Sequence, residues 1–120
     1  MERRFRLTQG VHFERVRRKG RSWPHSLIVL CATRNDLSYS RFGFLVSKRV
    51  GKAVMRNRVK RLLREVVRAR RSDVAPGWDV VLIARTSIVG AKLGRLEEAL
   101  DSLLWRARLI EKPSVRGGDE

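Results

Sequence analysis

Three segments of the chain have the hydrophobic pattern of β-strands: residues 26–33, 40–47 and 79–85. The last of these, "DVVLIAR", is apolar along most of its length, which predicts a strand that is buried on both faces of a sheet. Before the first strand, Phe13 and Val16 stand three residues apart. This spacing favours a short helix over residues 11–19 that ends at Gly20.

Two longer stretches repeat apolar residues at helical spacing, and each predicts an amphipathic helix with one face on a core. The apolar stripe of the first consists of Met55, Val59, Leu62, Leu63, Val66 and Val67. Another side of the same helix carries Asn57, Arg61, Arg64 and Arg68, with Arg56 and Lys60 in between. The apolar stripe of the second consists of Leu93, Leu96, Leu100, Leu103, Leu104 and Ala107.

The resulting order of elements is α-β-β-α-β-α, which predicts an α+β sandwich with helices packed on a small sheet. We expect the dipeptide Trp23-Pro24 to break the chain, and the two strands after it to form an antiparallel hairpin. A chain of 120 residues suffices for one modest core. We therefore predict a single domain over residues 1–112, followed by a polar and mobile tail over 113–120.

The net charge of the chain limits the classes of partner that it is expected to bind. It has 28 Lys and Arg against 12 Asp and Glu, a net charge of +16, which attracts polyanions such as nucleic acid, an anionic membrane or an acidic protein. No apolar run approaches the roughly 20 residues that span a bilayer, and the N-terminus lacks the apolar segment of a signal peptide. Cys31 is the single cysteine, so no disulfide framework is expected. These features predict a cytoplasmic protein.

Residues 48–71 concentrate this charge, since eleven of them are Lys or Arg and Glu65 is the one acid. A charge run is often only a solvated face. Here, however, like charges stand four residues apart at Arg56–Lys60, Lys60–Arg64 and Arg64–Arg68, and each such pair destabilises a helix by a few tenths of a kcal/mol. Arginine also suits bidentate contacts with phosphate. We therefore predict that this helix binds the phosphates of a nucleic acid.

Asn57 interrupts the arginines with a neutral amide, which can hydrogen-bond a base edge or a ribose hydroxyl. The alternatives are a local helix cap or a solvated side chain. The sequence has no helix-turn-helix, zinc or zipper pattern of DNA-binding proteins, which favours RNA as the partner.

The segment "SKRVGKAVMRNRVKRLLRE" resembles the signature of the bacterial ribonuclease P protein subunit, and "HFERVRRKG" and "DVVLIAR" extend the resemblance over nearly the whole domain. The resemblance implies a subunit that binds a catalytic RNA, ribonuclease P RNA, and the 5′ leader of precursor tRNA. In that family the RNA, with the Mg²⁺ that it mainly binds, removes the leader. The protein supplies no catalytic side chain and no metal ligand, and neither a membrane nor a small-molecule substrate is expected.

The same resemblance implies a fold like a ribosomal-protein domain, with a left-handed βαβ crossover around the basic helix. It also implies site residues. Those expected on the RNA-binding surface are Lys48, Arg49, Lys52, Arg56, Asn57, Arg58, Lys60, Arg61, Arg64 and Arg68. Those expected in a leader-binding cleft are Phe13, Arg17 and Cys31. Phe13 is equally consistent with ordinary core packing; Arg17 can stack through its guanidinium plane, whereas Cys31 cannot stack.

Three other function classes fit the sequence less well. A nuclease that acts without RNA needs paired carboxylates for a metal, or a histidine base. Its candidates are scattered: Asp73 and Asp79 lie on different elements, Glu97, Glu98 and Asp101 are expected to face solvent, and His12 and His25 suit structural or solvated roles. A membrane-surface helix would need aromatic residues on its apolar face, which here is aliphatic. A ribosomal protein or RNA chaperone is compatible with the composition, and only the signature argues against it.

Overall fold

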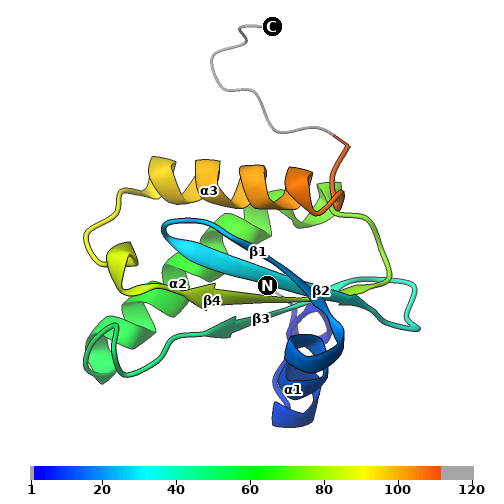
Figure 1. The fold of residues 1–120 in the computed structure, drawn as a ribbon, viewed down its shortest axis with the longest axis horizontal. Coiled ribbons are helices and arrows are strands. Elements are labelled where there is room, and N and C mark those ends of the chain that lie inside the picture. Colours follow the sequence, from blue (N-terminus) through cyan, green and yellow to red (C-terminus); the bar gives the residue numbers. More distant parts are fainter. Residues whose placement is uncertain (1, 112–120) are drawn as a thin grey trace, which may run out of the picture.

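The computed structural model describes residues 2–111, so the predicted tail over 113–120 lies outside the described residues. The α-helices are α1 (Gly10–Lys19), α2 (Ala53–Arg70) and α3 (Leu93–Arg106). The strands are β1 (Arg21–Pro24), β2 (Ile28–Arg34), β3 (Arg41–Leu45) and β4 (Trp78–Ala84). This arrangement confirms the α+β class, with helices on both faces of one sheet (Figure 1).

The strands lie in the order β1-β2-β4-β3, so the predicted hairpin between β2 and β3 is wrong. Strand β4 lies between them, antiparallel to β2 and parallel to β3. The physical reason is the apolar character of β4: Val80, Val81 and Leu82 are fully buried, and only a central strand covers both faces in this way. Helix α2 joins the parallel neighbours β3 and β4. The left hand of that crossover stays a prediction.

The dipeptide Trp23-Pro24 belongs to a strand, contrary to the expected break, and the element order therefore gains one strand before β2. Strand β1 pairs antiparallel with β2 and lies at the edge of the sheet. Proline is tolerated at an edge because no second neighbour needs its missing N–H. The neighbouring Trp23 packs against the larger of two hydrophobic cores.

Two apolar cores form on opposite faces of the sheet, and α1 and α3 lie on opposite sides of it (Figure 1). The larger core contains most of the predicted stripes of α2 and α3, including Val59, Leu63 and Leu100. The smaller core lies under α1 and contains Val16 and Val81. The amphipathic patterns thus identify most of the buried faces, but Leu93, expected in the stripe of α3, is exposed.

The outer edge of β3 is partly covered by the N-terminal segment. The backbone N–H of Leu7 donates to the carbonyl of Phe42 over 2.8 Å, and Arg6 forms an isolated parallel bridge with Phe42. This contact brings the first residues of the chain beside β3 and α2, where the expected site residues lie.

Candidate nucleic-acid interface

The cationic side of α2 consists of two rows that differ in exposure. Asn57, Arg58, Arg61 and Arg68 are exposed, and we call them the outer row. Arg56, Lys60 and Arg64 are half-buried, and we call them the inner row. Residues three, four or seven apart share one side of a helix that has about 3.6 residues per turn, so each row runs along the helix axis. The two rows together offer a broad cationic surface.

Most of these cations have no internal counter-charge. Within residues 2–111, no carboxylate forms an ion pair with Arg58, Lys60, Arg61 or Arg64. Arg68 pairs with Glu65 over 2.8 Å, but both side chains are more than half exposed, so the pair contributes little. The repulsion that the sequence predicted along α2 is therefore largely uncompensated in the fold.

Arg70 is the exception, because it points toward α3 and forms a two-point contact with Asp101, with distances of 2.5 and 3.1 Å. Asp101 was expected to face solvent, but it is buried with 5% exposure. It lies next to the Leu stripe of α3, where only a paired carboxylate is tolerated. The contact fixes α2 against α3.

The turn before α2 extends this surface with Lys48, Arg49 and Lys52, all of which are exposed. Lys52 is the N-cap residue of α2 and makes no side-chain cap hydrogen bond, and the first turn of the helix contains no acid. The positive end of a helix dipole thus coincides with three cationic side chains, an arrangement that favours a bound anion.

A groove of about 340 Å³ lies between α2, β3 and the N-terminal segment. Its cationic wall is formed by Lys60 and Arg64 of the inner row and by Arg6. Its aromatic wall includes Phe13 of α1 and Phe44 of β3. The groove therefore joins two surfaces that the sequence analysis treated separately, the basic helix and the cleft beside α1.

Phe13 is half-buried and packs in the smaller core against β3. The contact needs glycine at position 43, because a Cβ there would lie 2.6 Å from the Phe13 ring and 3.0 Å from the Cβ of Leu7. Phe13 thus packs on the smaller core and also lines the groove, and its role in leader binding stays a prediction.

Arg17 and Cys31 lie close enough for the charge of Arg17 to act on the thiol. Burial raises the pKa of Cys31 above its usual value and outweighs the opposing effect of Arg17. Cys31 belongs to the smaller core with 7% exposure, whereas Arg17 is exposed on α1. Neither side chain lines the groove, so Phe13 is the one member of the expected leader-binding cleft that does.

A buried carboxylate that sequence reasoning missed holds α1 in place. Asp79 has no exposed surface and accepts hydrogen bonds from Arg41 over 3.0 and 2.8 Å, from Arg15 of α1 over 2.6 Å and from Asn35 over 2.8 Å. Burial alone raises the pKa of Asp79, but the hydrogen bonds from Arg41 and Asn35 and the charges of Arg41 and Arg15 outweigh it and lower the pKa. The sequence signal for this buried carboxylate is a single acidic residue, Asp79, in an otherwise apolar strand.

The comparisons with known proteins identify the family. A family model described as Ribonuclease P matches residues 1–108. The ribonuclease P protein component of Roseiflexus castenholzii is 41% identical over 112 residues, which is 92% of this chain and 92% of the relative. The chain belongs to the ribonuclease P protein component family. The ribonuclease P protein component of Dehalococcoides mccartyi (strain ATCC BAA-2266 / KCTC 15142 / 195) is 40% identical. The match covers 92% of this chain and 91% of that relative.

Solved structures from the ribonuclease P family share the fold. The RNase P protein of Staphylococcus aureus superposes with a TM-score of 0.81 at 28% identity, covering 89% of this chain and 98% of that chain. The RNase P protein from Thermotoga maritima superposes with a TM-score of 0.77 at 30% identity, covering 84% of this chain and 96% of that chain. Membership of this family implies participation in an endoribonuclease that processes the 5′ end of tRNA, with an RNA as partner.

The acids and histidines do not form a metal-binding group in the part of the chain that is described. Among residues 2–111, no three His, Cys, Asp or Glu side chains converge on a common point. The Nδ1 atom of His25 accepts the backbone N–H of Leu27 over 3.1 Å; burial lowers the pKa of His25, as do Arg95 and Arg106. His25 thus stabilises a turn.

None of the described helices is both long and apolar enough to cross a bilayer.

Proposed function

We propose that this chain is the RNA-binding subunit of a ribonuclease P, in which the RNA cuts precursor tRNA. In this proposal the outer row of α2, with the turn at Lys48, Arg49 and Lys52, binds ribonuclease P RNA. The groove and the cleft at Phe13 and Arg17 receive the single-stranded 5′ leader. The complex works in the cytoplasm, and the Mg²⁺ needed for cleavage is bound mainly by the RNA.

The observation that carries the proposal is the uncompensated charge of α2 beside an aromatic groove. Folding leaves the exposed Arg58 and Arg61 and the half-buried Arg64 without acidic partners among the described residues, and the energetic penalty of their repulsion is relieved when phosphates bind. Unpaired bases stack on aromatic side chains, at roughly 1–3 kcal/mol per base. Phe13 and Phe44 supply such side chains next to Lys60 and Arg64.

The described residues contribute to this reaction by binding and by orientation. They do not fit a metal site, since no three potential ligands converge among them. Their expected effect is to hold the leader beside the RNA and to screen the repulsion between two polyanions, so that less Mg²⁺ is needed.

Reconstitution tests the proposal. The purified chain is added to a bacterial ribonuclease P RNA at a Mg²⁺ concentration too low for the RNA alone, and removal of the leader from labelled precursor tRNA is followed on a gel. We expect cleavage only when both components are present. No stimulation by the chain would contradict the role of a subunit. Cleavage by rigorously RNA-free protein would contradict the division of labour.

A further inference from the structure

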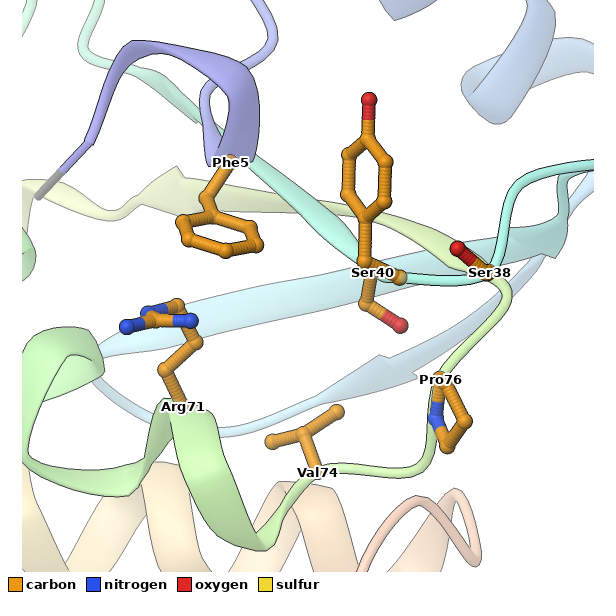
Figure 2. Close-up of a pocket in the computed structure, with 7 residues that line it drawn as sticks. Phe5, Ser38, Ser40, Arg71, Val74 and Pro76 are labelled. Atoms are coloured by element: carbon orange, nitrogen blue, oxygen red, sulfur yellow. The ribbon is translucent and has the colours of Figure 1, made fainter.

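A second, smaller cavity of about 120 Å³ lies beside the C-terminal end of α2 (Figure 2). Three separate segments form it. Phe5 comes from the N-terminal 3-10 turn, Ser38 and Tyr39 come from the loop between β2 and β3, and Arg71 follows directly after α2. None of these residues belongs to the surfaces described above, so the proposed function leaves this cavity without a role.

Arg71 is the charged group of this cavity, and its position is fixed by an aromatic ring. Its guanidinium carbon lies 3.9 Å from the centre of the Phe5 ring, and Figure 2 shows the guanidinium group beside that ring. Within residues 2–111, Arg71 forms no ion pair, and its Nε is buried without a hydrogen-bond partner. A buried donor without an acceptor is unfavourable. Among the described residues, Arg71 therefore has no acidic partner, and its guanidinium group can donate to an anion from outside the protein.

The surroundings of Arg71 are also cationic and polar. Phe5 and Tyr39 meet edge to face with ring centres 5.5 Å apart, and Arg4 lies 4.7 Å from the Phe5 ring. Glu2 pairs with Arg4 over 3.2 Å, but both side chains are largely exposed, so water screens that pair. The Ser38 side chain is exposed and lines the cavity, where its hydroxyl can donate to an anion.

This cavity continues the cationic path along α2. Arg71 is the first residue after α2 and follows Arg68 of the outer row by three residues. At the other wall, Arg6 lines the groove and the preceding residue, Phe5, lines the cavity. An RNA that binds the outer row and continues toward the C-terminal end of α2 therefore comes close to Arg71.

We propose that the cavity at Arg71 binds a backbone phosphate of the partner RNA, as a contact beyond the groove and the outer row. This inference rests on the proposed function, which supplies the polyanion. The cavity volume of about 120 Å³ is well above the roughly 10–15 Å³ that one water molecule requires, so the cavity has room for a phosphate group. The Nη atoms of the guanidinium group are charged donors that can hydrogen-bond phosphate oxygens.

The test compares Arg71→Gln with Arg21→Gln. Arg21 is a matched control because its guanidinium also lies over an aromatic ring, 5.3 Å from the centre of Trp23, but on β1 at the opposite edge of the sheet. Both variants lose one charge and one cation–π contact. The affinity of each protein for a bacterial ribonuclease P RNA is measured from 50 to 400 mM monovalent salt, and the thermal midpoint of each free protein is recorded as a check of folding.

For Arg71→Gln we expect weaker binding and a slope of log K against log salt that is smaller in magnitude by about 0.7–0.9, the change for one lost phosphate contact. Arg21→Gln should keep the wild-type slope. Inorganic phosphate should raise the thermal midpoint of the wild type more than that of folded Arg71→Gln. Equal slopes and equal phosphate shifts for the two variants would overturn the cavity proposal alone. Failure of the wild type to bind the RNA would overturn the proposed function itself.

Discussion

Removal of the Asp79 carboxylate is the most direct test of how the site is supported. Asp79 of β4 connects Arg15 of α1 with Arg41 of β3, and it has no exposed surface. In Asp79→Asn the side chain keeps its shape and loses its charge. In Asp79→Ala it loses every hydrogen bond. Both variants leave the cationic rows of α2 untouched, so a change in stability reports on the buried network.

The structure sets the expected magnitude. Removing one partner of a buried ion pair costs about 3–5 kcal/mol. Here the Arg41 and Arg15 side chains are 19% and 34% exposed, so both regain some hydration when the carboxylate is lost. We therefore expect Asp79→Ala to lower the free energy of unfolding by about 3 kcal/mol, which corresponds to a fall in thermal midpoint of roughly 10 °C for a domain of this size. Asp79→Asn should lose less.

Urea unfolding at several pH values provides the assay, with Asp36→Asn, an exposed acid, as the control for net charge. The folded-state pKa of Asp79 is lowered, so its stabilising effect is present above the unfolded-state pKa near 4 and is lost as the pH falls below it. The difference between wild type and Asp79→Asn should hence be constant from pH 5 to 8 and shrink below about pH 4. A difference under about 1 kcal/mol at pH 7, or one unaffected by acid, would refute the assigned role.

Three further predictions concern the RNA surface. Affinity for the RNA should fall by about 10³–10⁵ between 50 and 200 mM salt if some 6–10 phosphates are bound, and a flat response in a filter-binding titration would contradict this. Arg58→Ala and Arg61→Ala should each weaken assembly with the RNA far more than Arg21→Gln, whereas equal effects would indicate diffuse attraction by net charge. Gly43→Ala should displace the Phe13 ring and destabilise the protein by about 1–3 kcal/mol through overpacking, with weaker crosslinking of the leader; unchanged values in both assays would rule out this contact.

The secondary structure was largely predictable because burial imposes a period on each element. The stripe at Val59 and Leu63 assigned the buried face of α2, and the apolar run of residues 79–85 indicated a central strand. Strand neighbours were not predictable in the same way. A period of two shows which face of a strand is buried but not which strand lies beside it, so the proposed hairpin failed. The short strand at Trp23-Pro24 was not predicted, because proline suggests the end of an element. Proline is unfavourable in a central strand but is tolerated in an edge strand.

The site was predictable where function depends on charge density, and not where it depends on a pairing between distant residues. The cationic rows of α2 follow from the spacing of Arg61 and Arg64 alone. The partners of Asp101 and Asp79, in contrast, stand 31 and 38 residues away at Arg70 and Arg41, and no local pattern encodes such distances along the chain. The groove also depends on the N-terminal segment beside β3, which the sequence presents only as a polar start.

Strand β3 has one further consequence. Gly43 of β3 packs against the Phe13 ring, and a connection of seven residues leads from the end of β3 to α2. The aromatic and the cationic surface are therefore both joined to one five-residue strand. That element is fixed between β4 and the bridge at Arg6, which prevents it from sliding. The position of β3 therefore contributes to the distance between the aromatic and the cationic surface, and a ligand that contacts both must span that distance.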